Sequence, residues 1–419
     1  MPFPGKDACL SIERKVDRYL GPLLLGFLSL FSPSVRDGAR PRDPGKILLV
    51  KLHGIGNIVL LLPVLKQLRR RFPDAELDFL SFRENAGILE GTDEVGRCHF
   101  LDRGSIRGLV GSVLRVFPRI RRGGYDLVID FDQFAHFSAI ATLFTGAPGR
   151  IGFRNPTLRR HVAYTVPVVY LDMAHVSRTF ARLAEVAGAP YVPGLSRRIS
   201  LSEEHRREAS AFLSESAVSP GADVVVLHPG SSGNLTLRRW PAERFALLGD
   251  RIAAELGCTI VVSGGREERA LAESVRRMMR QPAVNSAGRL SVRGFAALCE
   301  QVLFVVSNDT AAVHVASAMG TPVVGLYGPN TPFLYGPLGS NDLVFYSEPS
   351  CSPCLSNLTS KVSDCRRARC MEEITVEAVF DGIRDRYFGS PEARDANRRA
   401  GLPFPGKRPE RALAGRLLP

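Results

Sequence analysis

The chain has 419 residues, of which 45% are hydrophobic and 23% are charged. This composition excludes a disordered chain, and eight cysteines in so long a chain exclude a small disulfide scaffold. The length suits two domains with flanking segments. The net charge of +13 favours an anionic partner, such as a nucleotide, a phosphorylated glycan, nucleic acid or an acidic membrane surface, without choosing among them.

Residues 1–45 are predicted to form an N-terminal arm that ends in a linker rich in proline, arginine and glycine. Within it, residues 19–31 are apolar but shorter than the ~20 residues that a spanning helix needs. Three interpretations stay open: a helix on an anionic membrane surface, which we favour, a helix packed on the protein's own body, and a signal peptide. With no other candidate span, we expect a cytoplasmic protein that is peripheral to the inner face of the cytoplasmic membrane.

Residues 46–200 are predicted to form the first domain. Apolar runs of buried-strand length occur at 46–51, 76–81, 126–131 and 149–153, and amphipathic stretches separate them. Strands that are buried on both faces and alternate with helices are typical of a parallel, doubly wound sheet.

The same pattern restarts in residues 201–387, with strands expected at 223–230, 258–265 and 304–308. The sequence therefore predicts an α/β fold with two Rossmann-like domains. Ligands are expected in a cleft between them, at the carboxyl ends of the strands. The basic tail, residues 388–419, is rich in proline, glycine and arginine and is expected to be disordered.

A glycine turn, Gly54-Ile55-Gly56, follows the first strand and precedes an amphipathic helix that is expected to open at Asn57. Strand, turn and helix in this order often begin a nucleotide-binding domain, but Val59 stands where the third glycine of the dinucleotide fingerprint would be. Asparagine is a good N-cap residue, so capping is the structural interpretation of Asn57.

Three loops in the second half carry residues suited to a nucleotide diphosphate. The loop at 228–240 offers the hydroxyls of Ser231 and Ser232 and the guanidinium of Arg238. The loop at 263–268 offers an acid, Glu267 or Glu268, for a ribose hydroxyl pair. Each loop also has a plain interpretation, as a solvated loop with a basic end or as acids at a helix start.

The third loop ends a strand at Asn308 and starts a helix that Asp309 or Thr310 can cap. The N–H groups and the positive dipole end of such a helix form a phosphate site. His314 lies one turn further along, on the same face as Thr310. A capped helix with a core histidine is the structural alternative.

Together these loops, "HPG…RRWP", "SGGREE" and "NDTAAVHVASAMGTPVVGLYGP", resemble the donor half of glycosyltransferase family 9, the lipopolysaccharide heptosyltransferases. The stretches that begin "KILLVKLHGIGN" and "YDLVIDFDQF" resemble its acceptor half, and the resemblance covers about residues 45–385. It implies a GT-B fold with no cofactor needed for catalysis. It also implies a nucleotide sugar, usually ADP-heptose, on the C-terminal domain and a lipid A–core acceptor on the N-terminal domain, with inversion by direct displacement.

The resemblance carries residue roles onto this sequence. Arg238 takes the family's position on the diphosphate, Asp309 and Thr310 take those at the sugar–phosphate helix, and Ala311 replaces a frequent glycine. The donor-binding residues expected from motif and resemblance are Ser231, Ser232, Arg238, Glu267, Asp309, Thr310, Ala311 and His314. The acceptor-binding residues expected are Gly54, Gly56, Gln133 and Arg150.

Asn57 stands where the family normally has an aspartate, the presumed base for the acceptor hydroxyl. An amide cannot accept that proton near neutral pH, and general base catalysis is worth about 10²–10⁴-fold. One hypothesis keeps transfer, with Asn57 orienting the hydroxyl and Asp130, Asp132, His53 or the departing phosphate taking the proton. The others are slow transfer, a nucleotide-sugar or glycan-binding protein without catalysis, and a two-domain nucleotide-sugar epimerase.

Basic clusters at 69–71, 115–124 and 154–160 fall in the acceptor half, where they would meet lipid A phosphates and anionic lipid or simply be solvated helix ends. No nucleic-acid-binding module is recognisable, so nucleic acid is not an expected partner. Four cysteines with C-x2-C-x10-C-x4-C spacing suggest a structural zinc site, with free thiols or a disulfide as alternatives: Cys351, Cys354, Cys365 and Cys370.

Overall fold

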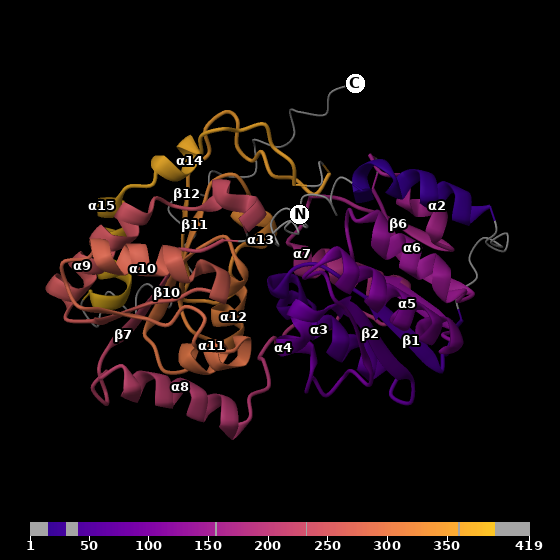
Figure 1. Ribbon diagram of the computed structural model, residues 1–419, viewed down its shortest axis with the longest axis horizontal. Coiled ribbons are helices and arrows are strands. Elements are labelled where there is room, and N and C mark those ends of the chain that lie inside the picture. Colours follow the sequence, from indigo (N-terminus) through magenta and orange to yellow (C-terminus); the bar gives the residue numbers. More distant parts are fainter. Residues whose placement is uncertain (1–15, 31–40, 156, 232, 359–360, 390–419) are drawn as a thin grey trace.

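The computed structural model describes residues 16–30, 41–155, 157–231, 233–358 and 361–389. Its two halves each contain one six-stranded parallel sheet, and helices cover the faces of both sheets (Figure 1). This arrangement confirms the predicted α/β fold with two Rossmann-like domains.

The first sheet has the strand order β3-β2-β1-β4-β5-β6. Its strands are β1 (Lys46–Val50), β2 (Glu76–Phe82), β3 (Cys98–Leu101), β4 (Leu127–Asp130), β5 (Gly149–Arg154) and β6 (Val166–Val169). The central strands are continuous apolar runs because helices cover both of their faces, and residues 47–50 of β1 are all buried.

The second sheet repeats this topology, in the order β12-β11-β10-β7-β8-β9. Its strands are β7 (Val224–His228), β8 (Thr259–Val262), β9 (Ala283–Asn285), β10 (Phe304–Asn308), β11 (Val323–Tyr327) and β12 (Leu343–Tyr346). The strand order reverses between β1 and β4 in one sheet and between β7 and β10 in the other. Loops at such switch points are where open α/β sheets bind ligands.

The helices lie between and around these strands. They are α2 (Gly21–Ser29), α3 (Ile55–Arg71), α4 (Ala86–Leu89), α5 (Ile106–Arg122), α6 (His136–Thr145), α7 (Val176–Val186), α8 (Glu203–Glu215), α9 (Ala242–Leu256), α10 (Arg269–Met278), α11 (Val292–Cys299), α12 (Ala311–Met319), α13 (Pro332–Tyr335), α14 (Arg369–Glu372) and α15 (Val376–Ile383). The predicted domain boundary at residue 200 falls between α7 and α8.

The two halves meet where α3 packs against α12, in the middle of the molecule in Figure 1. One buried apolar cluster runs through this contact, with Leu49 and Leu61 from the first half and Val226 and Val313 from the second. We call the region around the α3–α12 contact the junction. The core of the protein is therefore continuous across it.

The N-terminal arm includes α2, which packs on α6 and on the short helix η2 (Arg159–Ala163). Leu25 is fully buried in this contact, and the Asp17 carboxylate accepts hydrogen bonds from the backbone N–H groups of His136 and Phe137, at 3.0 and 2.7 Å. Asp17 thus satisfies two N–H groups at the start of α6 that have no partner within the helix.

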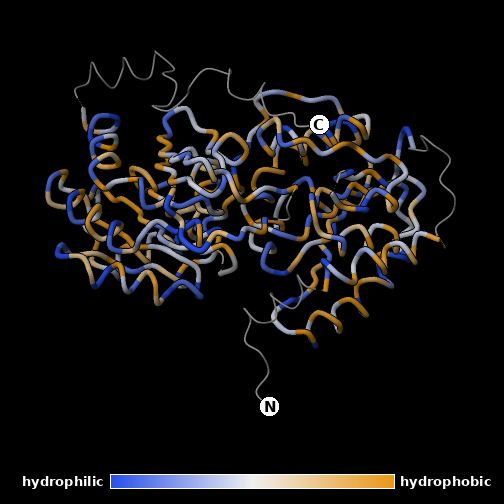
Figure 2. The backbone as a smooth tube through the Cα atoms, turned by 90° about the horizontal axis from the view of Figure 1, so that it is seen from above, coloured by the Kyte–Doolittle hydropathy of each residue, from blue (hydrophilic) through white to orange (hydrophobic). Residues whose placement is uncertain are grey.

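The outer face of α2 is apolar and exposed, with Leu23 71% and Leu30 79% accessible. Figure 2, which colours the backbone by hydropathy, shows a hydrophobic helical segment near the N-terminal end of the chain at the edge of the molecule. The helix is therefore packed on the protein's body along one face and leaves a second apolar face open. Among the described residues, no helix combines the length and the apolar character needed to cross a membrane.

Candidate functional site at the junction

The turn after β1 brings the first half's polar residues to the junction. Gly54 has φ +93°, a conformation that favours glycine, and α3 begins immediately after it at Ile55. The prediction that Asn57 caps this helix is wrong, because Asn57 is the third helical residue and Gly54 occupies the N-cap position. The Asn57 side chain is half-buried and folds back toward Gly54, where an added Cβ would lie 3.0 Å from its Nδ2.

Gly56 is required for the contact between the halves. A Cβ at this position would lie 2.6 Å from Cδ2 of His314 and 3.3 Å from Cα of Ala311. No side chain larger than hydrogen fits there without movement of α12. The first turns of α3 and α12 therefore touch, and both present their positive dipole ends to the same region.

The start of α12 has the cap that its sequence predicts. Thr310 is the N-cap residue, and its Oγ1 accepts a hydrogen bond from the backbone N–H of Ala312 at 3.3 Å. Asp309 Oδ2 accepts from Arg238 Nη1 at 3.0 Å and from Asn330 Nδ2 at 2.8 Å. Burial works to raise the pKa of Asp309, but the charge of Arg238 and these bonds hold the pKa below its usual value.

Arg238 and Asp309 are both buried, and Arg238 Nε has no hydrogen-bond partner among the described residues. Ser231 is also buried, and its hydroxyl donates to the Leu235 carbonyl and accepts from Arg239 Nε. Arg239 thus holds the loop, while Arg238 retains one donor for an anion. Ser232 lies outside the described residues.

The acid that meets the 228–231 loop is Glu268, which corrects the choice of Glu267. Glu267 is exposed, whereas Glu268 Oε2 lies 3.7 Å from His228 Nε2 and accepts from the Gly265 N–H at 2.8 Å. A Cβ at Gly230 would lie 2.2 Å from Glu268 Oε1. The sequence "REE" offers two adjacent acids, Glu267 and Glu268, for this role, and the geometry of the turn selects Glu268.

His314 is a neutral imidazole at the junction. Burial lowers its pKa to about 3, and its Nδ1 has no hydrogen-bond partner in the part of the chain that the structure describes. Its ring packs on Gly56, which explains why it faces the first half rather than solvent.

Asp130 and Asp132 do not serve as proton acceptors for a substrate, because the fold uses their oxygens. Asp130 Oδ2 accepts hydrogen bonds from Arg160 Nη2, Ser138 Oγ and Tyr164 OH, at 2.9, 2.9 and 2.7 Å. Burial works to raise the pKa of Asp130, and the charge of Arg160 opposes that effect. Arg160 is fully buried too, so this member of the predicted 154–160 basic cluster is not free to meet lipid phosphates.

Asp132 is fully buried and is bound by Lys51 Nζ at 2.6 Å and the Leu52 N–H at 2.7 Å. Burial disfavours its charge, yet Lys51 and His53 hold the pKa of Asp132 well below its usual range. His53 is the remaining candidate: its side chain is 28% exposed, and its Nδ1 lies 3.7 Å from Asp132 Oδ1. The ring of Phe82 contacts it edge-on.

The two polar residues predicted to bind the acceptor have different surroundings. Gln133 is buried at the junction, where its Nε2 donates to Tyr335 OH at 3.4 Å and its Oε1 has no partner among the described residues. Arg150 is buried in the first half, with Nε donating to the Ala163 carbonyl and Nη1 to the Ala147 carbonyl. Arg150 therefore holds the backbone around β5, and its assignment to the acceptor is corrected.

The structure also places at the junction residues that the sequence reasoning missed. Asn357 donates from Nδ2 to Tyr170 OH and Tyr335 OH, which lie in different halves, and Lys361 lies above the Tyr335 ring. The sequence could have singled out Lys361, because it is the only lysine between residues 67 and 406. Nothing in the sequence distinguishes Asn357 in this way.

The four cysteines of the predicted zinc site gather in one region of the second half. Cys351 is exposed, Cys354 and Cys365 are half-buried, Cys370 is buried, and all four are free thiols. Within the described residues, no group of three or more histidine, cysteine, aspartate or glutamate side chains is arranged to hold a metal ion. Burial raises the pKa of Cys370, and the other three thiols lie close enough to add to that effect. The structural zinc site therefore stays a prediction.

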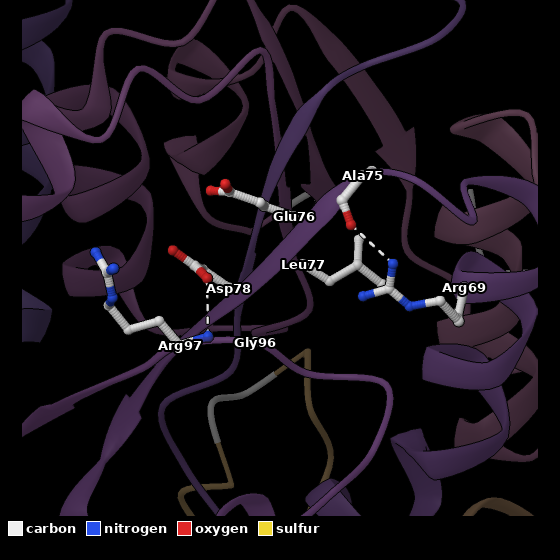
Figure 3. Close-up of a pocket in the computed structure, with 7 residues that line it drawn as sticks. All are labelled: Arg69, Ala75, Glu76, Leu77, Asp78, Gly96 and Arg97. Atoms are coloured by element: carbon white, nitrogen blue, oxygen red, sulfur yellow. Dashed lines mark hydrogen bonds between the residues drawn. The ribbon is translucent and has the colours of Figure 1, made fainter.

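A separate surface hollow lies at the amino end of β2, away from the junction (Figure 3). Its polar groups serve the fold: Arg69 Nη1 donates to the Ala75 carbonyl, and Asp78 Oδ1 accepts from the Arg97 N–H. Arg69 also binds the Glu94 carbonyl, so this residue of the predicted 69–71 cluster ends α3 and is not available to a lipid.

Comparison with known proteins identifies the family of this chain. The model of "Glycosyltransferase family 9 (heptosyltransferase)" matches residues 113–362, more than half of the chain. The lipopolysaccharide core heptosyltransferase OpsX of Haemophilus influenzae is 22% identical over 72% of this chain and 84% of its own length.

Solved structures of the same family share the architecture. A family 9 glycosyl transferase from Veillonella parvula has a TM-score of 0.67 and 22% identity, covering 82% of this chain and 97% of its own. The E. coli ADP-heptose lipopolysaccharide heptosyltransferase II has a TM-score of 0.64 and 20% identity, covering 85% and 99%. The architecture is GT-B, and the chain belongs to glycosyltransferase family 9.

Proposed function

We propose that this glycosyltransferase moves a heptose-like sugar from ADP-heptose to a sugar of the lipopolysaccharide core or of another lipid-linked surface glycan. The observation that carries the proposal is the meeting of α12 with α3, where Arg238, Asp309 and Thr310 lie at one helix start and the Gly54–Asn57 turn lies at the other. A diphosphate at the α12 start would put the sugar carbon opposite the turn that receives the acceptor.

The reaction is a single displacement. The acceptor oxygen forms a bond to the sugar's anomeric carbon while the bond from that carbon to the phosphate oxygen breaks, and the nucleoside diphosphate leaves. The N–H groups at the α12 start and Arg238 stabilise the negative charge on the departing phosphate. Glu268, beside Gly230, would hold the ribose hydroxyls.

The acceptor's proton needs a base other than Asn57. His53 has a partly exposed imidazole beside the turn, and the Asp132 carboxylate behind it favours the imidazolium that forms when the proton arrives. Asn57 would donate its amide hydrogen bond to the acceptor and orient the hydroxyl.

A specific observation favours the rival function, a nucleotide-sugar or glycan-binding protein without catalysis. Both carboxylates near the turn are consumed by Lys51 and Arg160, and the family's aspartate is an amide here. The first experiment separates the two functions. Purified protein is incubated with ADP-heptose and other sugar nucleotides, with and without lipid A–core extract, and release of nucleoside diphosphate is followed.

We expect release that depends on the acceptor, which would establish transfer despite Asn57. Tight binding of a donor with no release under any acceptor would instead establish the binding function. A nucleotide sugar whose sugar is altered without any second substrate would point to an epimerase.

We also propose that the enzyme is peripheral to the inner face of the cytoplasmic membrane, held there by the exposed apolar face of α2. Arg18 lies beside that face, 5.8 Å from the Tyr19 ring, and supplies a cation for anionic headgroups. An enzyme bound to the membrane surface and its lipid-linked acceptor would both diffuse in the plane of the membrane, which favours their encounter.

A further inference from the structure

A short segment of the second half crosses the junction and contacts the first half. Asn357 Nδ2 donates to Tyr170 OH at 2.6 Å, the Leu358 carbonyl accepts from Thr157 Oγ1 at 2.7 Å, and Ser356 Oγ donates to Asp172 Oδ2 at 3.0 Å. The backbone N–H of Lys361 donates to the Ser356 carbonyl at 2.8 Å. These bonds tie Lys361 to a strap, residues 355–358, that bridges the halves.

The Lys361 side chain lies at the junction without a counterion of its own. Its Nζ sits 3.9 Å from the centre of the Tyr335 ring, and no described residue accepts a hydrogen bond from it. Its backbone has φ +55°, which residues other than glycine rarely adopt. Such a conformation in a non-glycine residue is concentrated at functional sites.

Four charged groups face Lys361, two from each half. Asp309 and Arg238 belong to the proposed donor site, and Lys51 and Asp172 belong to the first half. Burial is the main reason that the pKa of Lys361 falls to about 7; Asp309 and Asp172 oppose the fall, while Arg238 and Lys51 add to it. Two carboxylates and two other cations surround the ammonium, so a bound anion would favour its charged form.

We propose that Lys361 is a donor-binding residue whose ammonium contacts the diphosphate of the nucleotide sugar, opposite Arg238. This inference rests on the proposed function. The strap to which Lys361 is hydrogen-bonded touches both halves, so the contact would add a cation to the leaving group where the halves meet. The choice of lysine also has a consequence, because an ammonium can lose its charge near neutral pH and a guanidinium cannot.

The proposal predicts that the affinity for the donor falls as pH rises. The protonated amine binds the diphosphate, so binding raises the pKa of Lys361 above its value in the free enzyme. Affinity is then full below pH 7 and falls as pH rises above 7, because a proton must be taken up with the donor. His314 and His175 have pKa values lowered to about 3 and about 4 by burial, so they stay neutral over this range.

The test measures dissociation constants by calorimetry from pH 6.5 to 8.5 with ADP-heptose, ADP-glucose, UDP-glucose and GDP-glucose. Both phosphates of these compounds are diesters and do not titrate in this range, unlike the terminal phosphate of ADP. Wild-type affinity for the nucleotide sugar that binds should fall about tenfold across the range, since each pH unit above the pKa removes up to tenfold of the charged form.

Three variants make the test specific. Lys361→Arg keeps the charge and should bind with little pH dependence. Lys361→Asn removes the charge and suits the left-handed backbone; it should bind about tenfold more weakly at pH 6.5, since a charge-assisted contact is lost, and should show no pH slope. Lys46→Asn is the control, because Lys46 pairs with Glu76 at the far end of β1 and should not matter. His53→Gln, run in parallel, shows whether that side chain contributes to the pH slope.

Wild-type affinity and pH slope in Lys361→Asn would overturn the inference while leaving the proposed function intact. Failure of the wild type to bind any nucleotide sugar would contradict the proposed function, and the inference would fall with it. If Lys361→Asn does not fold, the wild type decides: bound nucleotide sugar should slow acetylation of Lys361 relative to Lys46, and equal rates for both lysines would overturn the inference.

Discussion

Asp130, Asp132 and His53 lie close together in the fold, yet their surroundings give them different chemistry. The two carboxylates are fully buried and bound by Arg160 and Lys51, and such pairs are strongly destabilising to break. His53 lies one residue beyond the buried stretch and keeps part of its ring in solvent. All three are candidates from the sequence, but only burial separates the structural carboxylates from the candidate proton acceptor.

Replacement of His53 by glutamine tests its role directly. We expect kcat to fall about 100-fold, within the range typical of a lost general base, while the dissociation constant of the nucleotide sugar stays unchanged. The measurement is acceptor-dependent release of nucleoside diphosphate together with calorimetric donor binding. An unchanged kcat would assign the proton to the departing phosphate.

A second substitution, Asn57→Asp, provides the matched control. A carboxylate in the first turn of α3 is favoured by the helix dipole and offers the base that the family normally has. It should raise kcat in the His53→Gln background, because it replaces the lost proton acceptor. If the double variant is no faster than His53→Gln, the turn has reorganised around the amide.

At the scale of elements, the approach of α3 to α12 depends on a missing side chain. Gly56→Ala would place a methyl carbon 2.6 Å from the His314 ring, so the two helices must separate. We expect the free energy of unfolding to fall by about 1–3 kcal/mol, as for other overpacked contacts, and donor turnover to fall with it. Denaturant unfolding and the release assay measure the two effects.

Gly111→Ala is the control for that experiment. Gly111 lies in the middle of α5, and an added Cβ there would have no heavy atom within 4 Å. Removing a helical glycine at an open position should stabilise the protein by about 0.5–1 kcal/mol. Equal effects of the two alanines would show that the α3–α12 contact is not tight.

The sequence predicts the central strands, the glycine turn and the α12 cap, because each depends on local residues. Buried strands are continuous apolar runs, and Thr310 caps the helix that follows it. The helix α8 was not predicted, because most of its residues are polar and the helical spacing of its few apolar residues is hard to recognise. Its start depends on a capping box of Ser202 and His205. The short edge strands β9 and β12 were missed for a similar reason, because their residues are only partly buried.

The sequence predicts a site residue correctly only where the type of that residue and its own loop are enough to suggest its role. Arg238, Asp309 and His314 do lie together, as their loops suggested. Burial reassigned Arg150, and side-chain direction replaced Glu267 by Glu268. These outcomes depend on neighbours that are distant in sequence, so no local pattern contains them.

At the scale of the whole molecule, α2 gives the enzyme a face that differs from the rest of its surface. Leu23 and Leu30 are exposed on it, so Leu23→Ser with Leu30→Ser should weaken binding to vesicles without harming the fold. We expect at least a tenfold loss of partitioning, because burying one leucine side chain is worth about 1.5–3 kcal/mol. Sedimentation with vesicles of phosphatidylethanolamine and phosphatidylglycerol measures it.

The control for the membrane experiment is Leu247→Ser, since Leu247 is an exposed leucine on α9 in the second half. It should leave vesicle binding unchanged. Equal sedimentation of all variants, or none for the wild type, would contradict attachment through α2.

The apolar cluster that continues from Leu49 and Leu61 to Val226 and Val313 bears on how the protein comes apart. Neither half can unfold without exposing apolar side chains of the other half. The contact between the halves therefore contributes to the free energy of unfolding of both. The two sheets should therefore unfold as one cooperative unit. Each half expressed alone would expose the apolar side chains that the other half covers, and such a patch promotes aggregation.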